Sequence, residues 1–249
     1  MRGIPLSAAQ STWLLVLLLL WAALLFGGFL FGAPGSGAGR RMPVWTRMAS
    51  SATLVLAAWS WYWFSRGSSA AGFAVLVAIG MSCGMAGDLF MAKVLPVSHH
   101  TLAGIGAFAL GHVAYIAACL SFGNAQGLDA GAARFGAWAA WLLIGLLGWY
   151  LVVFRGQTPT FLQRAALPYS LLLASTAGVA TGLALQASSF IPLAVGAGLF
   201  LVSDLILAAG LFAGRHFALM DDVIWLTYGP AQMLIVYSVG SALRLASGG

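Results

Sequence analysis

The sequence predicts an all-α integral membrane protein whose single domain, residues 1–249, is a bundle of eight transmembrane helices. Of the 249 residues, 61% are hydrophobic and only 6% are charged, whereas soluble domains carry about 25% charged residues. The apolar residues stand in uninterrupted runs, which indicate helices and not the alternating strands of a membrane barrel. The eleven basic residues give a net charge of +6. They lie almost wholly between the runs, as membrane topology requires, so we expect no nucleic-acid partner.

Eight apolar runs come close to the roughly 20 residues that a helix needs to cross a bilayer. The first is longer than the roughly 7–15 apolar residues of a secretory signal, so we expect it to be retained as a helix. A Gly/Ala/Ser-rich stretch at 33–39 follows it and is expected to be a flexible connector. In chain order, the runs cover residues 12–32, 49–64, 70–90, 101–122, 134–154, 163–186, 190–213 and 223–244.

Basic residues are unevenly distributed between alternate loops. One side of the bundle carries Arg40, Arg41, Arg47, Lys93, Arg155, Arg164 and Arg215, and the other carries Arg2, Arg66, Arg134 and Arg244. The positive-inside rule places the richer side in the cytoplasm and both termini outside. We therefore expect a bacterial inner (cell) membrane protein with its active site facing the cytoplasm.

Two carboxylates, Asp88 and Asp204, stand inside apolar runs in matching contexts. Each is followed by Leu, two further apolar residues and Ala. An ionisable residue at membrane depth costs about 2.5–3.5 kcal/mol on insertion scales and is a functional hypothesis by default. The structural alternatives are a snorkelling carboxylate at the end of its run for Asp88 and a buried hydrogen-bonding role for Asp204.

The matching contexts are part of a wider repetition. Asp88 and Asp204 are 116 residues apart, His112 follows Asp88 by 24 residues, and Tyr228 follows Asp204 by 24 residues. Because an even number of spans separates the equivalents, the pattern predicts two parallel four-helix halves, residues 1–125 and 130–249. The two Asp residues would then share a cavity at equal depth. Chance similarity between two apolar helices is the alternative.

Several polar residues fall outside this repetition. Cys83 and Cys119 lie near opposite ends of neighbouring helices, so no disulfide is expected. Asp221 and Asp222 are interpreted as a solvated turn. The chain has no Walker loop, no G-x-G-x-x-G fingerprint and no H-E-x-x-H zinc motif. We therefore expect neither a cofactor nor a metal.

Four stretches taken together resemble the YhhN family of membrane lysoplasmalogenases, which share the eight-helix layout. They are Gly87–Phe90, Ala107–Tyr115, Phe200–Ala208 and Tyr228–Gln232. The resemblance covers most of the chain. One departure is Gly229-Pro230 between the Tyr and the Ala-Gln, where relatives often have another residue.

The resemblance implies hydrolysis of the vinyl ether bond of a lysoplasmalogen to a fatty aldehyde and a glycerophospho-alcohol, with a lysophospholipid substrate and membrane lipids as partners. Vinyl ethers hydrolyse by protonation at carbon, which forms an oxocarbenium ion. One carboxylic acid would donate that proton, while a second would stabilise the cation and deprotonate water, as paired carboxylates do in glycosidases. We assign Asp88 and Asp204 as catalytic, with Asp204 as the acid because it lies deeper in its run. The supporting residues are His112, Tyr228 and Gln232, and the substrate-binding residues are Phe108, Tyr115, Ser203 and Lys93.

A proton-coupled membrane transporter is the alternative function. Intramembrane Asp and His residues in repeated halves would serve it equally well. Transporters usually have broken helices at matching positions of both halves, whereas only the last span of this chain has an internal Gly-Pro pair. Turnover in detergent, where no gradient exists, would separate the two functions.

Overall fold

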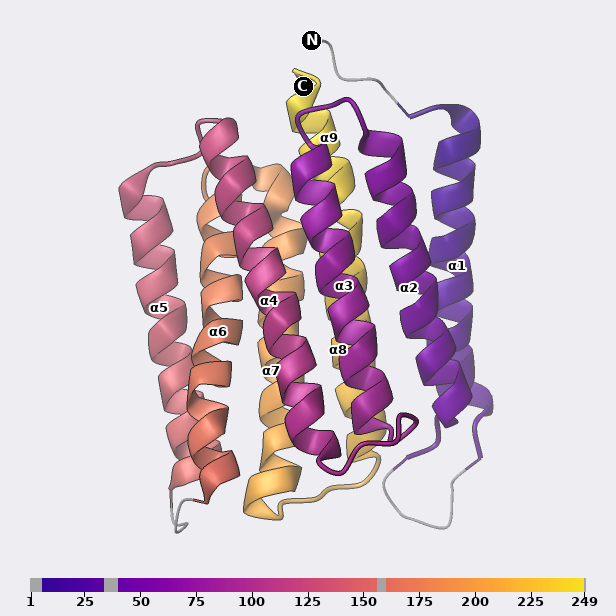
Figure 1. Cartoon of the computed structure of the whole chain (residues 1–249), viewed down its shortest axis with the longest axis vertical. Helices are drawn as coiled ribbons and strands as arrows, with labels where there is room; N and C mark the ends of the chain where they lie inside the picture. The colour runs from indigo at the N-terminus through magenta and orange to yellow at the C-terminus, as the bar shows by residue number, and fades with distance from the viewer. Residues whose placement is uncertain (1–5, 34–39, 156–159, 249) are drawn as a thin grey trace.

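The computed structural model describes residues 6–33, 40–155 and 160–248, and in these ranges every regular element is a helix. The predicted all-helical bundle is thereby confirmed. The long helices run alternately up and down (Figure 1). They are α1 (Ala8–Phe31), α2 (Val44–Ser65), α3 (Ala71–Met91), α4 (His100–Ala125), α5 (Gly131–Trp149), α6 (Phe161–Ala184), α7 (Ile191–Ala213) and α8 (Met220–Tyr237). Short elements adjoin three of them: the π-helix η1 (Tyr150–Phe154) after α5, the 3-10 helix η2 (Ser188–Phe190) before α7, and α9 (Val239–Ala246) after α8.

Seven helical segments of the described chain are long and apolar enough to cross a membrane, which fits an integral multi-pass membrane protein. The exception is α2, which has sufficient length at 22 residues but a more polar composition. Most of its polar side chains are buried inside the bundle and do not face the surroundings. They include Thr46, Arg47, Ser50, Ser51 and Thr53.

The helix starts differ from the predicted ones for local reasons. The first helix begins at Ala8, because Ser7 and Gln10 form a reciprocal capping box there. Helix α2 begins at Val44, directly after the extended Pro43. Arg47, which we had assigned to a loop, therefore lies inside this helix. Of the predicted connector, residues 34–39 lie outside the described residues.

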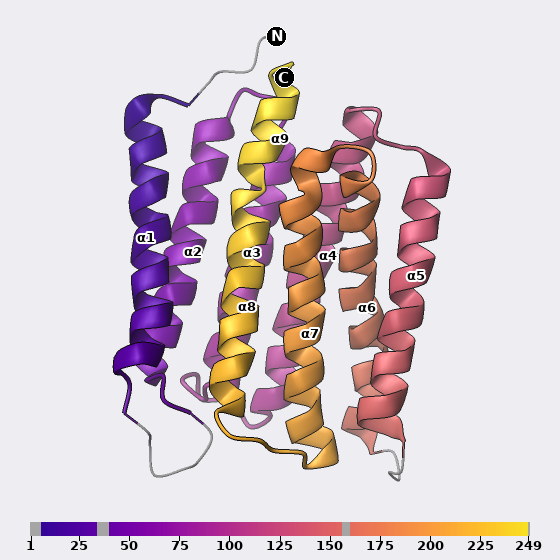
Figure 2. The same cartoon turned by 180° about the vertical axis from the view of Figure 1, so that it is seen from behind.

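Long helices that are neighbours in sequence pack as antiparallel pairs, except α4 and α5, and the most extensive contacts between the two halves of the chain are α4 against α6 and α2 against α8. Because α6 is the fourth helix after α2 and α8 is the fourth after α4, these two contacts are equivalent under the predicted repeat. The repeat itself stays a prediction. The start of α1 and the end of α9 lie at one end of the bundle, and the connections after α1, α3, α5 and α7 lie at the other (Figures 1 and 2).

Glycines allow α3 and α4 to approach closely. The ring of Tyr115 lies over Gly80, and an added Cβ at Gly87 would stand 2.7 Å from the Phe108 ring. This packing fixes the positions of two aromatic side chains that face the centre of the bundle. The thiols of Cys83 and Cys119, on these same helices, are free, as expected.

Candidate functional site

A polar cavity of about 410 Å³ has both Asp88 and Asp204 in its lining. It opens at the end of the bundle that carries the connections after α1, α3 and α7, because the exposed residues Arg40, Lys93 and Asp221 belong to it. Its complete lining is Arg40, Val44, Arg47, Asp88, Met91, Ala92, Lys93, Phe108, Asp204, Leu207, Asp221, Ile224, Trp225 and Tyr228. The two intramembrane carboxyl groups therefore face a common space.

Asp88 is held by a chain of buried hydrogen bonds from three helices. Its Oδ2 accepts from Ser51 Oγ of α2 at 2.5 Å and from the Tyr228 hydroxyl of α8 at 3.1 Å. Gln232 Nε2 donates to the Tyr228 oxygen at 3.1 Å, and Gln232 Oε1 accepts from the Tyr115 hydroxyl at 2.8 Å. Asp88 is only 4% exposed. Its carboxyl group is thus fixed inside the bundle and does not snorkel to the membrane surface.

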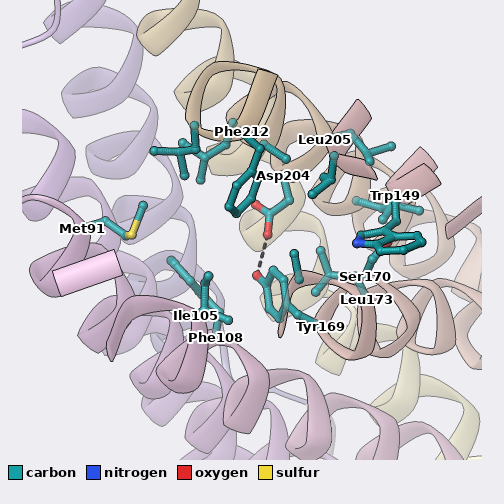
Figure 3. A pocket seen from close by; sticks show the side chains of 16 residues that line it. Met91, Ile105, Phe108, Trp149, Tyr169, Ser170, Leu173, Asp204, Leu205 and Phe212 are labelled. Carbon is teal, nitrogen blue, oxygen red and sulfur yellow. Dashed lines mark hydrogen bonds between the residues drawn. The ribbon is translucent and has the colours of Figure 1, made fainter. Parts of the chain in front are cut away.

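Asp204 has a similar but simpler environment (Figure 3). Its Oδ2 accepts from the Tyr169 hydroxyl of α6 at 2.5 Å, and Ser203 Oγ lies 3.4 Å from its Oδ1. In each half of the chain, the helix that precedes the Asp-bearing helix supplies a hydroxyl donor: Ser51 to Asp88 and Tyr169 to Asp204. Asp204 is half-buried, so it is the more accessible of the two carboxyl groups.

His112, which we assigned as a supporting residue, makes no hydrogen bond to either carboxyl group. Its Nδ1 lies 2.9 Å from Thr176 Oγ1 of α6, and its ring centroid lies 4.4 Å from that of Phe200. The side chain is 1% exposed. It therefore bridges α4 and α6 and packs against α7, which is the role of an interhelical hydrogen-bonding residue.

The predicted substrate-binding residues divide into two groups. Phe108 and Lys93 line the polar cavity. Tyr115 and Ser203 belong to neither of the cavities beside Asp204, and they are 2% and 0% exposed. Ser203 Oγ donates to the Phe200 carbonyl oxygen at 2.8 Å. These two hydroxyl groups are therefore internal hydrogen-bonding groups, and their assignment to substrate contact is corrected.

A narrow apolar cleft adjoins the polar cavity between α4, α6, α7 and η1 (Figure 3). Its volume is about 50 Å³, and aliphatic and aromatic side chains make up most of its lining. Four residues line both spaces: Met91, Phe108, Asp204 and Leu207. Asp204 consequently stands where a polar and an apolar space meet.

Sequence reasoning did not single out Arg47, Ser51, Tyr169 or Thr176. Arg47 and Ser51 are one helical turn apart on α2 and face the cavity and Asp88 respectively. Their spacing, i and i+4, was the available signal, but the predicted run began at residue 49, so it included Ser51 and left Arg47 in the preceding loop. Tyr169 and Thr176 gave no such signal, because their partners come from other helices.

The fold and the site define a polytopic helical membrane protein with a polar site that holds two carboxyl groups inside the bundle. Residues 42–239, which include every site residue described above except Arg40, match the YhhN family. The chain belongs to the YhhN family, as the resemblance had indicated. No curated protein and no solved structure matches it significantly.

Proposed function

We propose that this protein is a lysoplasmalogenase-type hydrolase that cleaves the vinyl ether bond of a lysoplasmalogen. The observation that carries the proposal is the position of Asp204 at the junction of the polar cavity and the apolar cleft, with Asp88 on the same polar cavity. Membership in the YhhN family is consistent with a hydrolase.

The two spaces suit the two ends of a single-chain lipid. The polar cavity would take the glycerol and headgroup, and the apolar cleft would take the hydrocarbon chain once its aliphatic side chains rotate apart. In a lysoplasmalogen, the vinyl ether is the group that joins the chain to the glycerol. Such a pose brings the reacting bond next to Asp204.

The proposed reaction uses the two carboxyl groups in different roles. Asp204, as the acid, donates a proton to the vinyl carbon that is not bonded to oxygen, which leaves an oxocarbenium ion. Asp88, whose Oδ2 accepts two hydroxyl hydrogen bonds, stabilises this cation and takes a proton from the attacking water. The hemiacetal that forms collapses to a fatty aldehyde and a glycerophospho-alcohol, so one water is consumed for each bond broken.

Aldehyde release from lysoplasmalogen by purified protein in detergent tests the proposal. We expect Asp88→Asn and Asp204→Asn to lower the rate by about 10²–10⁴-fold, the usual contribution of a general acid or base. Asp129→Asn is the matched control, because Asp129 is exposed and precedes α5 at the opposite end of the bundle. A folded Asp88 or Asp204 variant with the parental rate would overturn the two-carboxylate mechanism. A parent without turnover would overturn the lysoplasmalogenase assignment.

A further inference from the structure

We infer that Arg47 is the anchor for the phosphodiester group of the substrate. This inference rests on the proposed function and adds a recognition residue to it. It places the phosphate at Arg47 and not at Lys93, the basic residue that the sequence analysis assigned to substrate binding.

Arg47 is a buried cation that faces the polar cavity. Its side chain is 7% exposed, it lines the polar cavity, and among the described residues its Nε has no hydrogen-bond partner. Its guanidinium carbon lies 5.3 Å from the Trp225 ring centroid, a cation–π contact that helps to hold the group in place. A desolvated guanidinium with free donors is a site that an anion would complete, and its planar fork matches phosphate oxygens.

Two of the three carboxyl groups that line the cavity are hydrogen-bonded to other residues, and the third, Asp221, is exposed at the cavity mouth. Asp88 accepts from Ser51 and Tyr228, and Asp204 accepts from Tyr169. All of these donors are neutral hydroxyl groups. A ligand phosphate can therefore approach Arg47 without first breaking a hydrogen bond of Asp88 or Asp204.

The position of Arg47 along α2 fits the length of the substrate. Ser51, the donor to Asp88, lies one turn deeper on the same helix face, and four residues correspond to a rise of about 6 Å. In a lysoplasmalogen, the three glycerol carbons separate the vinyl ether from the phosphate, a distance of the same order. A vinyl ether beside the carboxyl groups would therefore place its phosphate at Arg47.

The other cations of the lining are poorer anchors. Arg40 and Lys93 are both exposed at the cavity mouth, where water and salt screen their charges. Arg47 alone among the three basic residues of this lining is buried. It should therefore contribute most to phosphate affinity.

The experiment compares two substrates that differ only in the headgroup: 1-alkenyl-glycerophosphoethanolamine and phosphate-free 1-alkenylglycerol. We expect Arg47→Gln to lower kcat/KM for the phospholipid by about 10–100-fold, mainly through KM, the usual cost of losing a hydrogen bond between charged groups. Its rate on 1-alkenylglycerol should stay within about twofold of the parent, and Arg47→Lys should fall between the two. Arg66→Gln is the matched control and should behave like the parent. Arg66 also stacks on a tryptophan, with its guanidinium carbon 4.4 Å from the Trp63 ring centroid, but it is exposed at the other end of α2.

Two outcomes on active protein would overturn the inference. An equal loss on both substrates would mean that Arg47 acts on Asp88 or on folding. No loss on the phospholipid would mean that the phosphate binds elsewhere.

If the proposed function is wrong, the result is different: the parent protein cleaves neither substrate. Binding of a non-cleavable acyl lysophosphoethanolamine then tests the anchor alone. At least tenfold weaker binding to Arg47→Gln than to the parent and to Arg66→Gln supports it, and equal binding overturns it.

Discussion

Gly84 leaves the space through which the Tyr228 side chain reaches Asp88. Under the 116-residue repeat, Gly84 corresponds to Phe200, and Tyr228 corresponds to His112. Tyr228 and Gln232 pass over Gly84, and Tyr228 thereby reaches Asp88. At the equivalent place Phe200 fills the space and contacts the His112 ring. Under the predicted repeat, His112 would reach Asp204 as Tyr228 reaches Asp88, but only the Tyr228 hydrogen bond is formed.

Gly84→Ala should disrupt the chain of hydrogen bonds that ends on Asp88. The added Cβ would stand 2.6 Å from Gln232 Nε2 and 3.5 Å from the Tyr228 oxygen. Overpacking of this kind costs about 1–3 kcal/mol, and we expect the melting temperature in detergent to fall together with aldehyde release. Gly72→Ala is the control on the same helix, where an added Cβ meets no atom within 4 Å. It should be neutral or should stabilise the protein by up to about 1 kcal/mol. Indistinguishable melting temperatures for the two variants would contradict this prediction.

At the scale of elements, the first turn of α8 holds the segment that leads into α2. Asp222 is 1% exposed, and its carboxylate accepts from the backbone N–H groups of Arg41 at 2.5 Å and Met42 at 3.0 Å. The interpretation of Asp221 and Asp222 as a solvated turn is therefore wrong for Asp222. Asp221 is exposed and lines the cavity. This attachment fixes the start of α2 and, with it, the position of Arg47.

Asp222→Ala should destabilise the protein by about 1–3 kcal/mol for each buried N–H group that loses its acceptor. Asp221→Ala removes an exposed carboxylate from the neighbouring position and should change the free energy of unfolding by less than about 0.5 kcal/mol. Thermal unfolding of both variants in detergent measures the difference. Equal melting temperatures would show that the contact of Asp222 with residues 41 and 42 adds nothing to stability.

At the scale of the whole molecule, the cavity opens at the end of the bundle that carries most of the basic residues. Arg40 and Lys93 stand at this mouth, and the start of α1 and the end of α9 lie at the opposite end (Figure 2). By the positive-inside rule, we propose that the mouth faces the cytoplasm of a bacterial cell. A lysolipid would then enter from the inner leaflet.

Cysteine labelling in intact cells tests this orientation. Ser98→Cys lies at the end with the mouth and Ser69→Cys at the other end, and both positions are exposed. A membrane-impermeant maleimide should label Ser69→Cys in intact cells, and Ser98→Cys only after the cells are opened. The parent serves as the blank, because Cys119 is buried and Cys83 half-buried. The reverse labelling pattern would place the mouth outside the cell.

The sequence by itself determined the helical bundle and the order of its helices, and it singled out Asp88 and Asp204, which both line the polar cavity. Runs of apolar residues report a free energy of transfer that depends on composition and length alone. A carboxyl group within such a run is costly wherever the helix packs. These properties belong to a single helix, so they can be predicted without knowing which other helices pack against it.

Only the tertiary structure decided which groups meet those carboxyls. Arg47 lay outside the predicted run, Ser51 and Tyr169 lay inside predicted runs without being singled out, and His112 pairs with Thr176 of another helix. Each of these contacts depends on how two helices rotate and cross, which is set by packing at positions such as Gly84 and Phe200. Hydrogen-bond partners from distant helices are fixed by that geometry, which spacing along a single helix does not encode.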